Sequence, residues 1–436
     1  MSIEQMTKAR EAAMNTSAYK NLLKFFDENS FSEIDGFAKS GKNYAEVVAG
    51  FGMVEGMPVY AFAQNRDVCG GAMSKAHAAK VKKIYDLALK TGAPVVGFYD
   101  SIGGKLREGN ELLAGYGDVL KASGQLSGVV PQISVILGNC LGTGALTAAN
   151  ADFIIMNKKA TLSLSTMGTE GTAEDNAKKG ISALTAENNA EAIAKARELI
   201  TYLPSNNLSS SAAAFEAAPA AAPKCPAEMV ADENTLFELY ANYGSQAVVS
   251  LGRVDGRVVG FVGTKGESVG YHAGDKIAKF VRFCDAFSIP VITFVNSEEF
   301  TSIKTASKVT SAYAEATTVK ISVVTGTAVG ALYIAMAGSG ANTDVTFALP
   351  QAIISPVTPE AAAFIMAPEK MNVVPAKQKE AAMKFAQAEL SAFKAAENGF
   401  VEDVITEDEL RGKIAAALEM LEGKRVPTLA KKHSTI

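Results

Sequence analysis

Two matching glycine-rich segments, one in each half of the chain, carry the residues best suited to chemistry. Residues 133–145 read ISVILGNCLGTGA, and residues 321–333 read ISVVTGTAVGALY. In each, an apolar strand is followed by a turn, and a helix of small residues starts at Gly142 or Gly330. The first N–H groups of a helix lack partners within it and carry partial positive charge, so they can stabilise an oxyanion. The alternative is that the glycines only allow tight helix–strand packing, but their repetition favours the oxyanion hole.

A second candidate is the loop at residues 100–109, which reads DSIGGKLREG. It follows an apolar strand, and α/β sheets place ligands at the carboxyl ends of their parallel strands. Gly103 and Gly104 could present backbone donors, and Lys105 and Arg107 could face an anion. The spacing is not that of a phosphate-binding Walker loop. The alternative is a capped loop with solvated charges.

Two reactive side chains nearby are better interpreted as structural. Cys140 precedes the turn at Gly142, but no histidine lies close in sequence to act as its base, so we expect a small buried thiol. His77 lies in a predicted helix and is interpreted as a hydrogen-bonding residue. His77, His272 and His433 are far apart in sequence, so we predict no metal site. The chain also shows no Ser-His-Asp pattern, dinucleotide fingerprint or paired carboxylates.

The sequence segments that should position these residues also occur twice in the chain. The offset between the two copies changes from 200 residues in the first repeated block to 188 in the third. The blocks keep their order, which indicates a duplicated fold and a site built from two similar halves. The four pairs of blocks are 48–65 with 248–265, 90–101 with 286–297, 133–145 with 321–333, and 150–153 with 342–345.

Each half begins with two apolar strands around an acidic residue and a glycine, which predicts a β-hairpin. An amphipathic helix and a short, continuous apolar strand follow, a pattern typical of parallel sheets covered on both faces. The hairpin turns are expected at 55–56 and 255–256, the helices at 75–92 and 274–287, and the strands at 94–99 and 290–295. Two further helices are expected at 376–398 and 408–422.

Composition favours an ordinary globular protein with two cores. The chain has 436 residues, 48% of them hydrophobic and 20% charged, and a net charge of −4. It has no basic block for nucleic acid, no signal-peptide pattern, and no apolar run of the roughly 18 residues that a membrane helix needs. The scattered cysteines Cys69, Cys140, Cys225 and Cys284 are expected to be reduced, so we expect a cytoplasmic protein.

Longer segments carry a resemblance to a known family. In the first half they are GGAMSKAHAAKV (70–81), GAPVVGFYDS (92–101), EGNELLAGYG (108–117), SGVVPQISVILGNCLGTGA (127–145) and YLPSNN (202–207). In the second half they are KFVRFCDAFSIPVITFV (279–295), AYAEATTVKISVV (312–324) and a gapped match from 417 to 433. Together they resemble the carboxyltransferase subunits of biotin-dependent acyl-CoA carboxylases and decarboxylases, such as propionyl-CoA carboxylase β chains and methylmalonyl-CoA decarboxylase α chains.

The resemblance implies an α/β fold of two tandem crotonase-like domains, each a ββα spiral, related by internal duplication. It implies that the N-terminal domain binds acyl-CoA and the C-terminal domain binds biotin. The expected divisions are an N-terminal helical extension at 1–44, the acyl-CoA domain at 45–203, a linker at 204–227, the biotin domain at 228–405, and a C-terminal helix and tail at 406–436.

The resemblance also implies one oxyanion hole in each domain. The matching positions are Gly142 and Thr143 in the first, and Gly330, Ala331 and Leu332 in the second. One hole would hold the enolate of a short-chain acyl-CoA thioester, and the other the ureido oxygen of biotin.

The implied cofactor is biotin on a partner carrier protein, and the implied substrate is a coenzyme A thioester. Further implied partners are a biotin carboxylase or a membrane decarboxylase subunit. The site would lie at a dimer interface within a dimer or a trimer of dimers.

The chain departs from the family pattern at both ligand loops. The family's DSGGAR-x-QEG appears as DSIGGKLREG, with Lys105 in place of arginine, and we assign Gly103, Gly104 and Lys105 to ligand binding on the first side. The second-half DxPGF appears as NSEEF, from Asn296 to Phe300, and residues that usually follow it are missing. In the family this stretch lines the biotin side, so we assign Asn296 and Phe300 to biotin binding. Two alternatives therefore stay open: a non-catalytic scaffold or regulatory paralogue, or a crotonase-type hydratase or hydrolase. The last is disfavoured because no carboxylate lies clearly beside either glycine turn.

Overall fold

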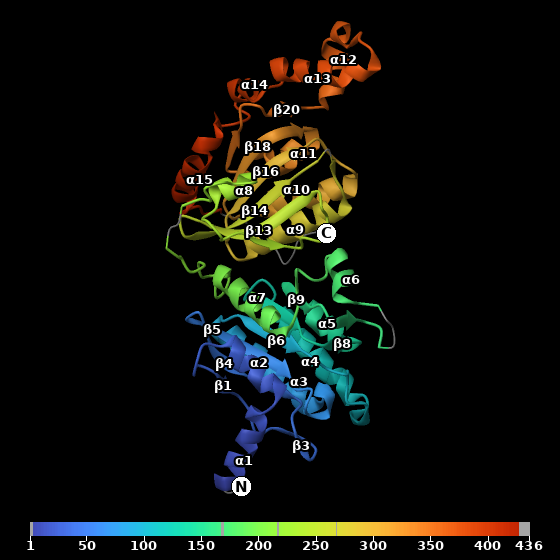
Figure 1. Ribbon diagram of the computed structural model, residues 1–436, viewed down its shortest axis with the longest axis vertical. Coiled ribbons are helices and arrows are strands. Elements are labelled where there is room, and N and C mark those ends of the chain that lie inside the picture. Colours follow the sequence, from blue (N-terminus) through green and yellow to red (C-terminus); the bar gives the residue numbers. More distant parts are fainter. Residues whose placement is uncertain (1–2, 167–169, 216–217, 267, 427–436) are drawn as a thin grey trace. The chain divides into compact units, whose positions relative to one another are not determined.

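The computed structural model describes residues 3–166, 170–215, 218–266 and 268–426 (Figure 1). The chain separates into two compact units, Met1–Ala212 and Ala213–Ile436, called unit 1 and unit 2 below. His433 and the end of the predicted C-terminal tail lie outside the described residues.

Unit 1 is built on a seven-stranded sheet in the order β1-β4-β5-β6-β7-β9-β11. The first three strands are antiparallel, and from β5 onward neighbouring strands run parallel. Its strands are β1 (Ser32–Glu33), β4 (Val47–Val54), β5 (Met57–Gln64), β6 (Val95–Tyr99), β7 (Gln132–Ile136), β9 (Phe153–Asn157) and β11 (Leu184–Ala186). Two small sheets pair β8 (Asn139–Leu141) with β10 (Thr161–Ser163), and β2 (Lys39–Ser40) with β3 (Asn43–Tyr44).

Unit 2 repeats this topology in an eight-stranded sheet, β12-β13-β14-β16-β18-β19-β21, with β20 paired to β18. Its strands are β12 (Phe237–Leu239), β13 (Ala247–Val254), β14 (Arg257–Thr264), β16 (Val291–Ser297), β18 (Lys320–Val329), β19 (Val345–Ala348), β20 (Ile353–Ser355) and β21 (Asp403–Val404). A small sheet pairs β15 (Ser268–Val269) with β17 (Glu299–Phe300). Both hairpins have the same register, since Val47 faces Gln64 and Ala247 faces Thr264.

Helices alternate with the strands in both units. Those of unit 1 are α1 (Ile3–Met14), α2 (Ser17–Phe25), α3 (Lys75–Thr91), α4 (Glu111–Leu126), α5 (Thr143–Ala149), α6 (Ala173–Lys178) and α7 (Asn189–Tyr202). Those of unit 2 are α8 (Pro226–Val230), α9 (Tyr271–Ala286), α10 (Ile303–Glu315), α11 (Gly330–Met336), α12 (Pro359–Met366), α13 (Pro375–Glu389), α14 (Ala392–Glu397) and α15 (Glu407–Leu421). Unit 2 therefore has α12, α13 and α14 where unit 1 has α6.

The sheet of unit 1 is covered on both faces, as its continuous apolar strands predict. Successive residues of a strand point to opposite faces. On one face, Phe98 packs against Phe25 of α2 with ring centroids 5.1 Å apart. On the other, Tyr99 packs against Phe62 at 5.6 Å, and Phe62 in turn packs against Tyr85 of α3. The fully buried strands therefore follow from helices on each side.

Each hairpin is fastened by the same kind of ionic clamp. In unit 1, the carboxylate of Asp27 accepts the N–H groups of Glu55 and Gly56 at the hairpin turn, both at 3.1 Å. Arg197 of α7 donates to Asp27 at 2.9 Å and to Glu55 at 2.6 Å. The clamp ties the turn to a helix that is distant in sequence.

In unit 2 the corresponding aspartate is Asp232. It accepts the N–H groups of Asp255 at 3.0 Å and Gly256 at 2.8 Å. Arg411 of α15 donates to Asp232 at 2.8 Å and to Asp255 at 2.6 Å. In unit 2, α15 thus occupies the place that α7 occupies in unit 1.

The predicted terminal elements are parts of the two units. Leu22 and Phe25 of α2 are buried in unit 1, and Leu410 and Ile414 of α15 are buried in the core of unit 2. The predicted helix at 376–398 is two helices, because Ser391 caps α14 with its side chain and ends the continuity of α13. The predicted helix at 274–287 begins earlier, at Tyr271.

Candidate active site

Three loops of unit 1 lie side by side at the carboxyl ends of β5, β6 and β7. Backbone hydrogen bonds join them: Met73 N donates to Gly103 O at 2.8 Å, Ile102 N to Gly70 O at 3.0 Å, and Ser101 N to Asn139 O at 2.7 Å. The middle loop, which follows β6, is therefore held between the other two. This is the edge where a doubly covered parallel sheet is expected to place a ligand.

The glycine that follows β7 is required by close packing against the next loop. A Cβ built on Gly138 would lie 2.1 Å from Oδ1 of Asp100, which is far inside van der Waals contact. The N–H of Asp100 donates to Oε1 of Gln64 at 3.1 Å. Asp100 thus links the ends of β5, β6 and β7.

The same arrangement recurs in unit 2 around Asn296. A Cβ on Gly326 would lie 2.1 Å from Oδ1 of Asn296, and the N–H of Asn296 donates to Oγ1 of Thr264 at 2.9 Å. Oδ1 of Asn296 also accepts the N–H of Thr327 at 3.1 Å. Asn296 therefore takes the structural place of Asp100, although the loop that follows it departs from the family pattern.

The predicted donor at Gly142 needs a correction. Gly142 has a φ of +61°, which favours glycine, and its N–H already donates to the carbonyl of Ser163 at 2.9 Å. The next N–H groups, those of Thr143 and Gly144, have no hydrogen-bond partner among the described residues. Of the two residues predicted for this hole, only Thr143 therefore has an N–H group without a partner among the described residues.

In unit 2 the predicted residues form the start of α11. Gly330 has a φ of +45°, and a Cβ there would lie 2.9 Å from the carbonyl oxygen of Pro356. Ala331 is exposed, whereas the side chain of Leu332 is buried and anchors the helix. The N–H groups of Ala331 and Leu332 belong to the first turn, where a helix offers them no acceptor.

The loop after β6 makes more hydrogen bonds within unit 1 than its glycine-rich sequence suggested. The N–H of Gly103 donates to the Ser101 hydroxyl at 3.0 Å. The Nζ of Lys105 donates to Glu46 at 2.8 Å and to the Ser40 hydroxyl at 2.5 Å. The hydrogen bond that Lys105 donates to Glu46 raises the pKa of Lys105 above its ordinary value. Lys105 thus forms an internal ion pair with Glu46, and its assignment to ligand binding stays a prediction.

Gly104 and Arg107 belong to this loop, and Phe300 lies in its counterpart in unit 2. Gly104 leaves space for Leu112, whose Cδ2 would lie 2.3 Å from a Cβ at that position. Arg107 is exposed. In unit 2, Phe300 is half-buried and lies in β17, opposite Val269 of β15.

Cys140 and His77 are structural residues, as expected. Burial raises the pKa of the Cys140 thiol to about 12, so it stays protonated and is a poor nucleophile. His77 is fully buried, and burial lowers its pKa to about 4. Its Nδ1 lies 3.4 Å from the carbonyl oxygen of Ala72. The imidazole is therefore neutral near pH 7.

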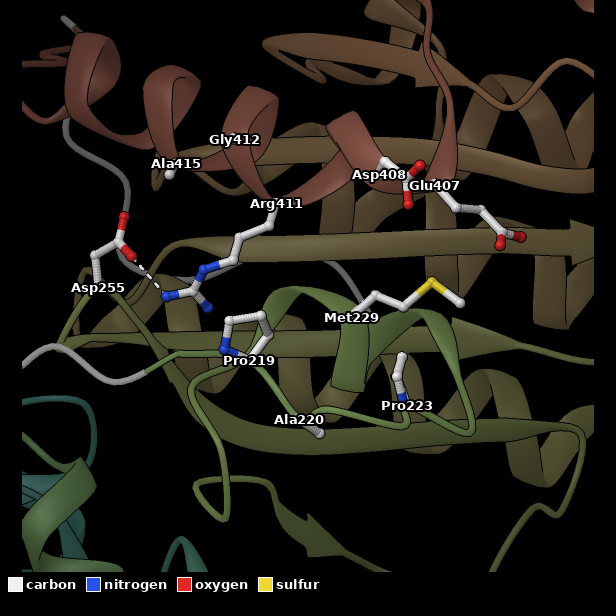
Figure 2. A pocket seen from close by; sticks show the side chains of 10 residues that line it. All are labelled: Pro219, Ala220, Pro223, Met229, Asp255, Glu407, Asp408, Arg411, Gly412 and Ala415. Atoms are coloured by element: carbon white, nitrogen blue, oxygen red, sulfur yellow. Dashed lines mark hydrogen bonds and ion pairs between the residues drawn. The ribbon is translucent and has the colours of Figure 1, made fainter.

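A cavity of about 520 Å³ opens in unit 2 away from these residues. It lies between α15, α8 and the segment before α8, and Arg411 reaches across it to Asp255 (Figure 2). None of the predicted site residues is among those that line it. The cavity belongs to the hairpin clamp of unit 2.

No group of three or more His, Cys, Asp or Glu side chains in the described part of the chain could hold a metal ion. The described helices include none with the length and hydropathy needed to cross a bilayer.

The two repeated units define a crotonase-like protein. The chain belongs to the carboxyl transferase domain family, whose model matches residues 15–436. It is 34% identical to the methylmalonyl-CoA decarboxylase subunit alpha of Veillonella parvula, over 99% of this chain and 95% of that protein. It is 33% identical to the mitochondrial propionyl-CoA carboxylase beta chain of Sus scrofa, over 89% of this chain and 80% of that protein.

A solved structure supports the same relationship. The chain matches transcarboxylase 12S, crystallised as a hexamer with methylmalonyl-coenzyme A and methylmalonic acid bound, with a TM-score of 0.91 and 30% identity. The match covers 99% of this chain and 97% of that one. Both units of this chain therefore have counterparts in a complete carboxyltransferase fold.

Proposed function

We propose that this chain is a carboxyltransferase that moves a carboxyl group between biotin and a short-chain acyl-CoA. The observation that carries the proposal is the family match, which spans both units rather than one. Each unit also keeps a glycine-led helix start after its central strands. Propionyl-/methylmalonyl-CoA or acetyl-/malonyl-CoA is the proposed substrate pair.

The proposed division of labour places the acyl-CoA thioester at unit 1. The N–H of Thr143, joined by that of Gly144, would stabilise the negative oxygen of the thioester enolate. Preformed backbone donors suit this task because they need no reorganisation as charge develops. The absence of an activated base at Cys140 or His77 agrees with chemistry that depends on positioning and on backbone donors.

Unit 2 is proposed to bind biotin on a carrier protein. Gly330 and the exposed Ala331 place no large side chain at the start of α11, which supports its assignment to the planar ureido group. When bound, biotin supplies the carbon carrier. The N–H groups of Ala331 and Leu332 would bind its carbonyl oxygen, and Asn296 and Phe300 would border it.

The proposed assembly is a homo-oligomer, a dimer or a trimer of dimers, with the site at the dimer interface. The hexameric transcarboxylase 12S supports this choice. Further proposed partners are a biotin carrier protein and either a biotin carboxylase or a membrane decarboxylase subunit. We place the assembly in the cytoplasm, where the free thiols Cys69, Cys140, Cys225 and Cys284 would stay reduced.

The decisive experiment measures carboxyl transfer from malonyl-CoA and from methylmalonyl-CoA to free biotin. We expect turnover with at least one of them. No turnover with either, by protein that is folded and assembled, would overturn the proposal in favour of a non-catalytic scaffold. Hydration or hydrolysis of an acyl-CoA without transfer would favour a crotonase-type enzyme instead.

A further inference from the structure

A buried carboxylate links two of the three loops at the candidate site. Glu46 directly precedes β4, and its side chain has an exposed fraction of 0%. Its Oε1 accepts a hydrogen bond from Nζ of Lys105 at 2.8 Å, and its Oε2 accepts one from Oγ of Ser74 at 2.6 Å. Burial opposes ionisation, but these two bonds hold the pKa of Glu46 below its ordinary value. Glu46 is therefore a carboxylate near pH 7.

Ser74 and Lys105, the two hydrogen-bond partners of Glu46, each lie at the end of a loop of the site. Ser74 is the N-cap of α3, and its hydroxyl oxygen accepts the N–H of His77 at 3.1 Å. Lys105 closes the loop after β6, and its own N–H donates to Met73 O at 2.8 Å. One carboxylate thus fixes the ends of the loops that follow β5 and β6.

The loop after β6 carries this restraint to the start of α5. The N–H of Ser101 donates to Asn139 O at 2.7 Å, and Asn139 begins the short strand that leads to Gly142. A shift of the loop would therefore also shift the surroundings of the N–H group of Thr143, which has no partner among the described residues. Catalytic rates are sensitive to such shifts, because a catalytic group misplaced by 1 Å can lower the rate by about 10²-fold.

Unit 2 serves as an internal control for this link. Gln246 is the counterpart of Glu46, since the backbone oxygens of both accept an N–H from the loop after the hairpin, Asn65 in unit 1 and Lys265 in unit 2, at 2.9 Å. Gln246 is exposed. The N-cap of α9 is Gly270, which has no side chain to offer. The same fold therefore forms in unit 2 without the link.

We propose that Glu46 is a positioning residue for acyl-CoA chemistry, which holds the loops after β5 and β6 in register with the start of α5. The proposal rests on the proposed function. Lys105 acts through Glu46 and does not bind the acyl-CoA directly. The link that Glu46, Lys105 and Ser74 form is called the Glu46 bridge below.

The first test is a double-mutant cycle with Glu46→Gln, Lys105→Gln and the double variant. The measurement is kcat and KM for methylmalonyl-CoA and malonyl-CoA with free biotin as acceptor. Each single change is expected to lower kcat/KM by about 10- to 100-fold. The double variant is expected to lose no more than the more severe single variant, because both changes break one link. Lys105→Arg, which keeps the charge, should recover most of the activity.

Two results would overturn the proposal. One is wild-type kcat/KM in Glu46→Gln. The other is additive losses in the cycle, which would show that Lys105 binds the substrate independently of Glu46. The matched control is Gln246→Ala in unit 2, which removes an exposed side chain outside the bridge and should leave kcat/KM unchanged.

The Glu46→Gln variant is expected to fold. The glutamine keeps an acceptor for Ser74, and Lys105, whose side chain is 24% exposed, is able to turn to solvent instead of staying as a buried unpaired charge. A second readout does not need activity. Hydrogen exchange of the intact protein should speed up in the loops 69–74 and 100–105 of Glu46→Gln, while the hairpin turn at 255–256 stays unchanged.

These readouts separate the two levels of the proposal. If wild-type protein transfers no carboxyl group but Glu46→Gln loosens both loops, the proposed function fails and the bridge stands as a loop restraint. If exchange in the two loops is unchanged, the positioning role fails whatever the wild-type enzyme does.

Discussion

The two units share a fold but differ in how firmly their site loops are held. In unit 1, Glu46 is fully buried and bonded to Lys105 and Ser74. In unit 2, the corresponding Gln246 is exposed, and the first turn of α9 begins at a glycine. The strands, the hairpin clamps and the glycine-led helix starts are common to both. The fold therefore needs the shared features, whereas the Glu46 bridge is an addition specific to unit 1.

The largest effect is expected from removing one N–H donor at each helix start. Thr143 is the first residue of α5, a position that accepts proline, and its N–H has no partner within the described part of the protein. Thr143→Pro should lower the rate of transfer by about 10²- to 10³-fold with little loss of stability. Thr143→Ala, which keeps the N–H, is the control and should be close to wild type.

The matching change in unit 2, Ala331→Pro, tests whether the two units bind different ligands. Ala331→Pro removes an N–H from the first turn of α11 and should abolish transfer to biotin, with Ala331→Ser as its control. It should spare exchange of the acyl-CoA α-proton, which Thr143→Pro should impair. Identical effects of the two proline variants on both reactions would contradict the assignment of different ligands to the two units.

Acid should weaken unit 1 more than unit 2. His77 is buried and has its pKa lowered to about 4, from 6.5 in the unfolded chain, so the unfolded state binds more protons between these values. Stability therefore falls as the pH drops from 6.5 to 4, by about 3 kcal/mol in total. Unit 2 has Ala273 at the corresponding position of α9.

The measurement is chemical unfolding of the wild type at several pH values, with the transition of unit 1 followed separately. His77→Gln should remove most of the pH dependence in this range. A wild-type stability that stays flat between pH 6.5 and 4 would show that His77 protonates as easily in the folded state as in the unfolded chain.

Equal and moderate effects are expected from Gly138→Ala and Gly326→Ala. Each new Cβ would meet an Oδ1 atom at 2.1 Å, of Asp100 in one unit and Asn296 in the other. Relief requires these short side chains to move, so each variant should lose about 1–3 kcal/mol of stability. Clearly unequal losses, measured by thermal unfolding of each variant, would mean that the two strand ends are not equivalent.

The smallest effect is expected at the ion pair between Arg66 and Asp100. Nη1 of Arg66 lies 2.6 Å from Oδ1 of Asp100, but the side chain of Arg66 is 48% exposed. Arg66→Ala should therefore change the free energy of unfolding by less than about 1 kcal/mol. Asn296 holds the same place in unit 2 without a charge, so a much larger loss would show that unit 1 depends on this charge in a way that unit 2 does not.

Much of the fold could be predicted because its signals are local. The turns at 55–56 and 255–256, the helix that ends at Gly92 and the buried strand before Asp100 all follow from short patterns, and the structure confirms them. The helix starts at Gly142 and Gly330 also follow from spacing. The division of the predicted helix at 376–398 depended on one capping serine, Ser391, which a periodic pattern does not reveal.

The details of the site depended on distant partners. Gly142 looked like a donor until its N–H proved to be bonded to Ser163, a residue 21 positions later. Lys105 looked like an anion ligand, but its partner Glu46 lies 59 positions earlier. The signal for Glu46 is a single acidic residue before an apolar strand, which by itself predicts nothing about burial.

Asp100 and Asn296 occupy equivalent positions in the two units, and this equivalence bears on how the units diverged. A carboxylate and a carboxamide have nearly the same size and shape, and each here places one oxygen 2.1 Å from where a Cβ on the facing glycine would lie. The duplicated scaffold thus offers a position where electrical charge is exchangeable at constant steric volume. Descendants of one ancestral half could specialise for differently charged ligands by an isosteric replacement, without repacking a single strand.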